Sequence, residues 1–299
     1  MQRRTFIEKT GLFAIGMGAF GSVSWREGEG RFIGDSPTTT DILGPWYRPG
    51  APFKKNLNPA GFNGEILRLS GTVFNEDGKT PMNDCLIEIW QCDRDGLYDN
   101  TSDAFIYRAS QRVKANGLYS FVTGIPVPYP TEADPTQYRP AHIHMRISAE
   151  GQQDLITQLY FKGDPNLETD PSTKSPLSVN RILPLTKIRD NESELRFDVV
   201  LGKQYRPDDA VFHKVSGIYK MSDNSMMEFY RDGDLLFYKR NNQISGGLSY
   251  RDANTFIGGV NDTEAAFELA AQGNATVRFR FSRRRETRLT GTKLVHYNR

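Results

Sequence analysis

Residues 66–74 read ILRLSGTVF, residues 75–81 read NEDGKTP, and residues 85–92 read CLIEIWQC. In the first segment apolar and polar residues alternate, which is the period of a strand with one buried face. Asp77 and Gly78 stand at the centre of the second segment, and Asp-Gly is a common sequence of tight turns. The third segment is short and rich in isoleucine, as strands are. The three segments therefore predict two strands joined by a turn.

The same character continues downstream. No sustained apolar stripe with the 3.6-residue period of a helix occurs in this region, and glycine, proline and aspartate separate the short apolar segments. We therefore expect an all-β protein in which residues 41–204 form an antiparallel β-sandwich. Its further strands are expected in GLYSFVTGI (117–125), HIHMRISAE (142–150), LITQLYF (155–161) and LRFDVVL (195–201).

A second group of strand-like segments follows residues 205–212, which we interpret as a linker. We expect residues 213–299 to form a small antiparallel β-sheet or barrel. The sequence does not decide among three roles for this domain: it could cap an active-site mouth, hold a homo-oligomer together, or bind a polymer. The segments are KVSGIYKM (214–221), MMEFYRDGDLLFYKR (226–240), GGLSYRDANTFIGG (246–259), AAFELAAQG (265–273), ATVRFRFS (275–282) and TGTKLVHY (290–297).

The N-terminus has the features of an export signal. Arg3 and Arg4 precede Phe6 and Ile7, and an uncharged stretch, GLFAIGMGAFGSVS (11–24), follows that is too short to span a bilayer. This arrangement resembles twin-arginine signals. The alternative is an amphipathic first helix, but each of the glycines in the stretch would cost about 0.8–1 kcal/mol in a helix interior.

We expect residues 1–24 to direct the protein to the periplasm, with an uncleaved anchor as the alternative to removal of the signal. Residues 25–40 are polar and glycine-rich, and we expect them to form an arm rather than part of a core. No other segment approaches transmembrane length, so no further membrane insertion is expected.

Charge gives no reason to expect nucleic acid or an anionic membrane as a partner. The chain of 299 residues carries 38 basic and 36 acidic residues, for a formal net charge of +2. The one basic run, Arg283–Arg285, is followed directly by Glu286 and is expected to be a solvated strand end or turn.

The only two cysteines, Cys85 and Cys92, are not expected to form a disulfide. Seven residues of strand at ~3.3 Å each separate them by roughly 23 Å, whereas a disulfide requires Cα atoms within about 7 Å. They also differ in parity and so face opposite sides of the sheet. We expect two unpaired, buried thiols.

Two of the four histidines stand two residues apart, as His142 and His144. On a strand such residues face the same side, which is the arrangement of two adjacent ligands of one metal. The pair alone is a weak signal, because an HxH pair on a strand is more often incidental than ligating. His213 and His296 are expected to be ordinary surface residues.

Tyrosines strengthen the signal. Tyr129 stands between two prolines, thirteen residues before His142, and Tyr98 follows the turn Asp95-Gly96. The histidines themselves belong to the sequence RPAHIH (139–144). These motifs resemble those of the intradiol ring-cleavage dioxygenases, and the resemblance extends from Gly44-Pro45 to about residue 161.

The resemblance implies a catalytic Fe(III) site with Tyr98, Tyr129, His142 and His144 as its ligands. It further implies that a catechol binds to the iron, that Tyr129 leaves the metal and acts as a base, and that both atoms of O₂ enter the product, a cis,cis-muconate-type dicarboxylate. The residue types suit this chemistry, since tyrosinate is a hard anionic donor whose unperturbed pKa is near 10 and which a strong Lewis acid keeps ionised at neutral pH.

Two further catalytic residues follow from the same resemblance. Arg139 is expected to stabilise charge on the substrate ring, because a guanidinium stays charged at any working pH; its alternative role is a structural salt bridge. Gln158 is expected to hydrogen-bond near this arginine and the substrate. Tyr138 replaces a tryptophan that is common in the family, and the loop from His144 to Gln158 is one residue shorter than in protocatechuate dioxygenases. These two differences leave the shape of the substrate pocket undecided.

Two other classes of function compete with this interpretation. A transthyretin-like β-sandwich can be a non-catalytic binding module, since fold alone does not imply function, but such a module would not need the four candidate ligands together. A zinc hydrolase would favour His, Cys and carboxylate ligands over two tyrosines. Trp46, Tyr47 and Tyr107 are expected either to line the substrate pocket or, more simply, to belong to the core.

Overall fold

The computed structural model describes residues 23–26, 31–34, 37–131, 134–259, 262–270, 274–282 and 286–296. The first 22 residues of the predicted export signal and the basic run Arg283–Arg285 therefore lie outside the described residues. Within the described residues almost all regular elements are strands, which confirms the all-β prediction. No helix among these residues is both long enough and apolar enough to cross a membrane.

The N-terminal part of the chain forms two five-stranded sheets, which we call the two-sheet domain. One sheet has the order β11-β10-β9-β4-β5 and the other the order β12-β13-β3-β14, with β6 paired to β3. The hairpins β1–β2 and β7–β8 are separate two-stranded sheets. The strands are β1 (Val23–Arg26), β2 (Arg31–Gly34), β3 (Ile66–Phe74), β4 (Cys85–Trp90), β5 (Arg108–Val113), β6 (Leu118–Gly124), β7 (Tyr129–Thr131), β8 (Asp134–Arg139), β9 (His142–Ser148), β10 (Leu155–Phe161), β11 (Ile182–Leu183), β12 (Thr186–Arg189), β13 (Glu192–Arg196) and β14 (Val199–Val200).

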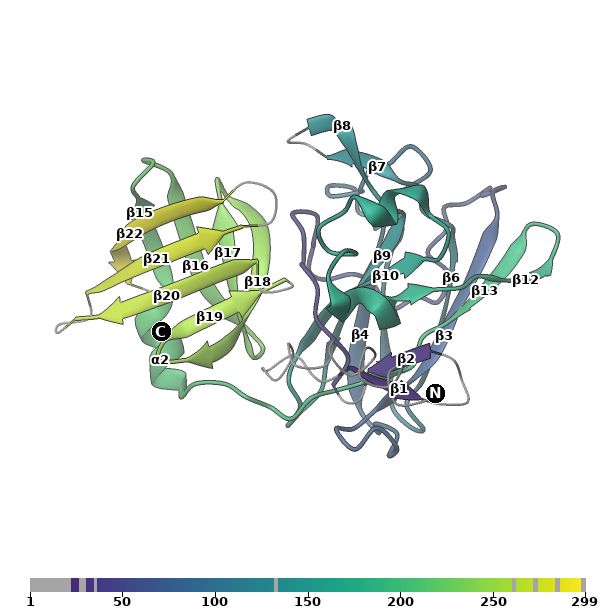
Figure 1. Ribbon diagram of the computed structural model, residues 1–299, viewed down its shortest axis with the longest axis horizontal. Helices are drawn as coiled ribbons and strands as arrows, with labels where there is room; N and C mark the ends of the chain where they lie inside the picture. The colour runs from purple at the N-terminus through teal and green to yellow at the C-terminus, as the bar shows by residue number, and fades with distance from the viewer. Residues whose placement is uncertain are drawn as a thin grey trace, which may run out of the picture.

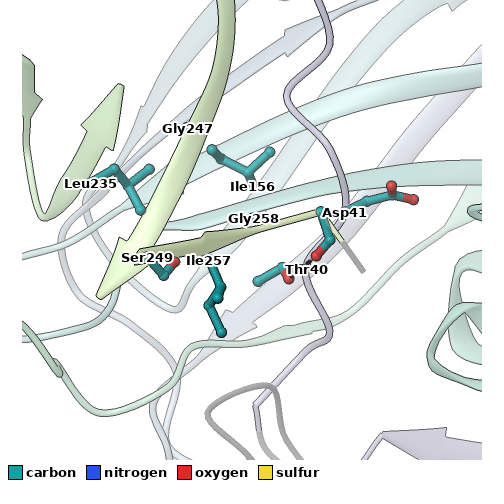
Figure 2. Close-up of a pocket in the computed structure, with 9 residues that line it drawn as sticks. Thr40, Asp41, Ile156, Leu235, Gly247, Ser249, Ile257 and Gly258 are labelled. Carbon is teal, nitrogen blue, oxygen red and sulfur yellow. Dashed lines mark hydrogen bonds between the residues drawn. The ribbon is translucent and has the colours of Figure 1, made fainter. Parts of the chain in front are cut away.

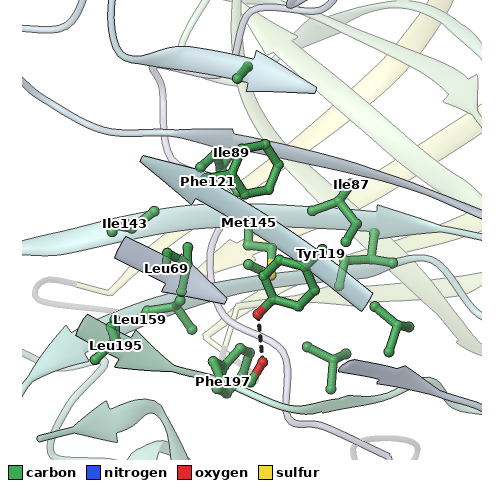
Figure 3. Packing of buried hydrophobic residues seen from close by; sticks show 14 of the residues in the cluster. Leu69, Ile87, Ile89, Tyr119, Phe121, Ile143, Met145, Leu159, Leu195 and Phe197 are labelled. Carbon is green, nitrogen blue, oxygen red and sulfur yellow. Dashed lines mark hydrogen bonds between the residues drawn. The ribbon is translucent and has the colours of Figure 1, made fainter. Parts of the chain in front are cut away.

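The two sheets share one apolar core (Figure 3). The β4–β9 sheet contributes alternate residues such as Ile89 and Met145, and the β3–β6 sheet contributes Leu69 and Phe121; all four are at most 1% exposed. The burial of each such side chain stabilises the fold by about 1.5–3 kcal/mol. The core fixes the register of β9 and thereby decides which of its residues point outward.

The outward face of the same sheet is polar and yet buried. On β9 it carries His142, His144 and Arg146, each at most 5% exposed. Trp90 of β4 pairs with His144, and Gln158 of β10 pairs with the same histidine from the other side. Because side chains alternate along a strand, one face builds the core and the other face carries the candidate site.

Parallel pairs correct the prediction of a purely antiparallel arrangement. β13 and β14 both pair with β3 in parallel, and β11 pairs with β10 in parallel. The reason is the long connection after β10, which contains the 3₁₀ helices η1 (Pro165–Glu168) and η2 (Pro176–Arg181) and returns the chain in the direction of β3.

The predicted strand 195–201 is interrupted at Phe197 and Asp198. A Cβ on Gly71 of β3 would lie only 1.8 Å from the Phe197 carbonyl oxygen, so the two backbones approach closely here. That oxygen accepts a 2.6 Å hydrogen bond from the buried Tyr119 hydroxyl (Figure 3). The Asp198 carboxylate accepts a hydrogen bond from the Thr72 amide, which replaces a ladder bond of the interrupted strand.

The C-terminal domain is a closed barrel, one of the two forms that the sequence predicts. Figure 1 shows it in green to yellow, beside the two-sheet domain in purple to teal. Its core includes aromatic side chains such as Phe229, Phe256 and Phe267. The barrel strands are β15 (Gly217–Met221), β16 (Met226–Asp232), β17 (Leu235–Arg240), β18 (Gln243–Asp252), β19 (Thr255–Gly258), β20 (Thr263–Leu269), β21 (Ala275–Phe281) and β22 (Thr287–His296).

The connection between the domains is not a plain linker. Helix α2 (Asp209–Val215) begins inside the segment 205–212 and buries Phe212 and Val215 in the barrel core. The Lys293 ammonium donates to the Lys214 carbonyl near the end of this helix, where cations are favoured. The sequence predicts a linker here because a proline and two aspartates are typical of loops, and because the helix is too short to show an amphipathic period.

The predicted arm also differs in part. β1 begins at Val23 and pairs with β2 in antiparallel. The last residues of the arm belong to the two-sheet domain: Thr39 is 2% exposed, and its hydroxyl donates to the Leu177 carbonyl. Thr38 and Thr40 are also hydrogen-bonded, to Val200 and Gly259. No pattern in the sequence predicts such contacts, because each is a hydrogen bond of a single threonine to a distant part of the chain.

Both cysteines are buried and unpaired, as predicted. Burial raises the pKa of Cys85 to about 12 and that of Cys92 to about 11. Both thiols therefore stay protonated and unreactive at neutral pH.

Candidate metal centre

Four predicted ligands converge at the outward face of β9. His142 and His144 lie on β9 itself, Tyr129 begins β7, and Tyr98 follows a turn after β4. The Tyr98 hydroxyl lies 3.4 Å from the Tyr129 hydroxyl and 3.2 Å from His144 Nε2. His142 Nε2 lies 3.2 Å from His144 Nε2, 3.3 Å from the Tyr129 hydroxyl and 3.4 Å from the Tyr98 hydroxyl.

These separations fit donors that surround one metal ion. Four donors placed tetrahedrally at about 2.1 Å from an ion would lie roughly 3.4 Å from one another. Among the described residues no group of three or more His, Cys, Asp or Glu side chains gathers in a way that could hold a metal. The donor set at this site is two imidazoles and two phenols, which suits a hard, strongly charged cation.

The electrostatics of the donors agree with that assignment. Burial raises the pKa of Tyr98 well above its ordinary value, and the neighbouring Tyr129 adds to the effect. Burial likewise raises the pKa of Tyr129. Two buried phenols would therefore ionise only beside a strong positive charge. Burial, with the charge of Arg139, lowers the pKa of His142 to about 3, so this imidazole is a neutral donor at neutral pH.

Neighbouring groups orient the donors. The Pro140 carbonyl lies 2.7 Å from His142 Nδ1, which leaves Nε2 facing the other donors. The Trp90 ring stacks on His144 at 4.9 Å and 9°. Trp46 stacks on Tyr98 at 5.8 Å and 14°.

Two glycines make room for this arrangement. Gly96 has a φ of +79°, and a Cβ there would lie 2.9 Å from the Tyr129 Cβ. Gly44 has a φ of +75°, and a Cβ there would lie 3.2 Å from His144 Cε1. Both positions require a left-handed backbone that glycine adopts without strain, and both bring backbone close to a candidate ligand.

Arg139 reaches the donors from the end of β8. Its Nη1 lies 3.3 Å from His142 Nε2, its Nε donates to Asp170 at 3.0 Å, and its Nη2 donates to Gln158 at 3.0 Å. Burial acts to lower the pKa of Arg139, but the charges of Tyr160 and Asp170 outweigh it and keep the guanidinium protonated. A fixed positive charge thus lies at the edge of the site.

Sequence comparison then identifies the family. The sequence model of a family described as dioxygenase matches residues 42–203, more than half of the chain. The chain belongs to the intradiol dioxygenase family. The matched segment contains all four candidate ligands and Arg139, whereas the barrel lies outside it.

Named relatives cover the same region. The chain is 36% identical over 172 residues to a chlorocatechol 1,2-dioxygenase of Rhodococcus opacus, a match that covers 50% of this chain and 66% of that protein. It is 37% identical over 180 residues to catechol 1,2-dioxygenase 2 of Acinetobacter lwoffii, covering 54% and 65%. Thus the chain spans slightly less than two-thirds of the length of these relatives.

A crystal structure of a mutant catechol 1,2-dioxygenase from Acinetobacter radioresistens is similar in fold. It has 24% sequence identity and a TM-score of 0.50, and the match covers 56% of this chain and 63% of that one. At this level of identity the likeness concerns the fold alone.

Behind Arg139, this member of the intradiol dioxygenase family has a buried polar network. The Arg139 Nη2 donates to the Tyr160 hydroxyl at 3.1 Å, and that hydroxyl donates to Asp41 at 2.8 Å. Asp41 also forms an ion pair with the fully buried Arg181. Sequence reasoning missed Asp170, Asp41 and Arg181; only Tyr160, two residues from Gln158 on β10, could have been found, from strand parity.

The other aromatic residues and histidines singled out in the sequence lie partly in the core and partly at the surface. Tyr47 and Tyr107 are each 6% exposed and belong to the core, the simpler of the two alternatives, whereas Trp46 contacts a candidate ligand. Tyr138 is 45% exposed, next to Arg139. His213 is exposed on α2, as expected. The His296 side chain lies outside the described residues.

Proposed function

We propose that the protein is an Fe(III)-dependent intradiol dioxygenase that cleaves a catechol-type ring between the two hydroxyl-bearing carbons and yields a cis,cis-muconate-type dicarboxylate. The observation that carries the proposal is the convergence of two phenols and two imidazoles, in which five of the six pairs of donor atoms lie 3.2–3.4 Å apart. The relatives named catechol and chlorocatechol 1,2-dioxygenases support the substrate class.

Bound ferric iron would supply a Lewis acid that binds the catechol and makes its ring reactive toward O₂. Tyr98, His142 and His144 would remain as its ligands. Tyr129 would accept a proton from a catechol hydroxyl at its phenolate oxygen, as a general base. Both atoms of O₂ enter the product, so catechol plus O₂ balances the dicarboxylic acid without a further reductant.

Arg139 would stabilise the negative charge that develops on the ring. Its Nη1 is the atom nearest to the donors, at 3.3 Å from His142 Nε2, while Asp170 and Gln158 hold the other two guanidinium nitrogens. A charge that is held in place before the reaction needs no reorganisation during it. Trp46 and Trp90 cover the donors with apolar surface and limit the access of water.

The proposal is tested by the visible spectrum of protein reconstituted with ferric iron. We expect a tyrosinate-to-iron charge-transfer band, a shift of that band when catechol is added without O₂, and a ring-opened dicarboxylate that carries both ¹⁸O atoms from ¹⁸O₂. Tyr98→Phe and Tyr129→Phe should each weaken or shift the band. Tyr205→Phe, at a tyrosine that is 51% exposed, is the matched control. A wild-type protein that stays colourless and iron-free would contradict the proposal.

A further inference from the structure

The metal-facing row of β9 continues into a contact with the barrel. Arg146 follows His142 and His144 on the same face of the strand, but its guanidinium contacts the barrel instead of the candidate ligands. Its Nη1 and Nη2 donate to the two carboxylate oxygens of Asp232, at 3.2 Å and 3.0 Å. Asp232 ends β16, so a bidentate ion pair joins the barrel to the strand that carries both histidines.

Aromatic rings form a second connection. Phe237 of β17 lies 5.8 Å from the Tyr47 ring, and Tyr47 lies 5.0 Å from Trp90. Trp90 in turn stacks flat on His144. The Tyr47 hydroxyl also accepts a hydrogen bond from Arg146 at 2.9 Å, which ties the two connections together. A continuous set of ring contacts therefore runs from the outside of the barrel to a candidate metal ligand.

The barrel surface at this contact is built for close packing. Leu236 and Tyr238 point into the barrel, whereas Leu235 and Phe237 alternate with them on its outer face and are still only 1% and 0% exposed. In Figure 2, Leu235 and Gly247 of the barrel lie beside Ile156 of β10.

Glycines allow the backbones to approach. A Cβ on Gly247 would lie 2.7 Å from Ile156 Cδ1, and a Cβ on Gly233 would lie 2.5 Å from an Asp154 carboxylate oxygen. The barrel therefore meets the two-sheet domain without space for side chains at these positions.

A third contact reaches the segment that lies between two candidate ligands. Gln243, at the start of β18, donates its side-chain amide to the Pro45 carbonyl at 3.0 Å. Pro45 stands between Gly44, whose backbone lies against His144, and Trp46, which stacks on Tyr98. The barrel thus contacts the segment 44–47 directly and reaches Trp90 through Tyr47.

We propose that the C-terminal barrel is a structural part of the metal centre: Phe237, Asp232 and Gln243 are positioning residues that hold Trp90 and the segment 44–47 against His144 and Tyr98. This inference rests on the proposed function for its catalytic meaning, but the geometry it describes exists in the metal-free protein. It gives the barrel, which lies outside the family match, a role in ring cleavage rather than in binding a separate partner.

Phe237→Ala is the decisive variant, because it removes the barrel ring from the set of contacts and leaves a cavity beside Tyr47. Phe279→Ala is the matched control: Phe279 is a buried barrel phenylalanine that faces the barrel interior. In iron-loaded protein we expect Phe237→Ala to lose iron to a chelator at least about 10-fold faster than wild type, as for the loss of a group that supports a metal ligand, and to shift the charge-transfer band. Phe279→Ala should keep both properties at wild-type values.

Equal iron loss and equal bands in Phe237→Ala and wild type would overturn the inference, as would the same change in both variants. If Phe237→Ala does not fold, Phe237→Leu keeps most of the apolar volume and removes the aromatic contact. For this variant the same faster loss of iron and shifted band are expected, and wild-type values would overturn the inference.

A metal-free measurement separates this inference from the proposed function. The chain has only four histidines, so their ring resonances can be assigned by NMR. Since Trp90 stacks flat on His144, its ring current acts on the His144 ring protons. Phe237→Ala should shift these resonances and Phe279→Ala should not. A wild type that binds no iron would contradict the proposed function, whereas unshifted His144 resonances in Phe237→Ala would contradict the inference itself.

Discussion

Gly96 illustrates how one residue can decide whether two candidate ligands meet. Its φ of +79° closes the turn that leads into Tyr98, and its missing side chain lets Tyr129 pack against that turn. An alanine would have a left-handed backbone, which costs about 1–2 kcal/mol, and its Cβ would lie 2.9 Å from the Tyr129 Cβ, a contact that only a shift of the chain relieves. The position therefore couples the stability of the turn to the distance between the phenols.

We expect Gly96→Ala to lower the free energy of unfolding by about 2–4 kcal/mol and to weaken iron binding strongly. Gly151→Ala is the matched control, because Gly151 has a φ of +73° and open space around a Cβ. It should cost about 1–2 kcal/mol and leave iron binding unchanged. Urea unfolding and iron titration measure the two effects. Equal iron affinity in both variants would contradict this account of the turn.

At the residue scale, sequence reasoning reaches the groups that carry motifs and misses the groups that support them. Tyr98, Tyr129, His142 and His144 stand in recognisable spacing, and the structure brings their donor atoms together. Asp170, which holds Arg139, lies in a connection without periodicity, 31 residues further along the chain. No local pattern marks such a residue, because its partner is set by how the chain returns to the sheet.

At the scale of elements, the alternation along strands is what the sequence predicts well. The segments around β3, β4, β6, β9 and β10 are all found as strands, because their apolar residues repeat with a period of two. The pairing of strands is predicted less well, since β13 and β14 join β3 in parallel only after a long connection. The helix α2 is missed because seven residues are too few to show a helical period.

The turn between β3 and β4 has a pH dependence of its own. The Asp77 carboxylate accepts hydrogen bonds from the Thr80 hydroxyl and from the amides of Thr80 and Lys79, and these bonds lower the pKa of Asp77 to about 2. In the unfolded chain an aspartate has a pKa of about 3.9. The stabilising effect of the ionised carboxylate is therefore fully present above about pH 4 and is lost as the pH falls through about 2.

We expect Asp77→Ala to lower the melting temperature at neutral pH, and we expect the difference from wild type to shrink as the pH falls from about 4 to about 2. Thermal unfolding followed by circular dichroism at several pH values measures this difference. A difference that stays constant over the whole range would show that the carboxylate does not act through its charge.

At the scale of the whole molecule, two domains share one interface that ends at the candidate metal centre. The sequence predicts two groups of strands but cannot place one against the other. The reason is physical: Phe237 and Leu235 alternate with residues of the barrel core, so both faces of β17 are apolar and the pattern does not say which partner covers the outer one.

We propose that the protein is exported to the periplasm by the twin-arginine route, on the evidence of Arg3, Arg4 and the apolar stretch 11–24. Replacing both arginines by lysine should leave the protein in the cytoplasm, measured by cell fractionation and immunoblotting. The paired replacement of Arg26 and Arg31, downstream of the signal, should leave export intact. Wild-type protein found only in the cytoplasm would contradict the proposal.

If the proposed export signal is removed, the contacts of Thr39 and Asp41 limit where the chain can be cut. Asp41 pairs with Arg181, which is 0% exposed, and also accepts hydrogen bonds from Tyr160 and Ser172. A protease that cut immediately before Asp41 would leave a new ammonium group beside this buried guanidinium and would remove Thr39, which also contacts Arg181. A cleavage that keeps these contacts and those of Thr38 with Val200 therefore has to fall upstream of Thr38, so a processed form would keep the last residues of the arm.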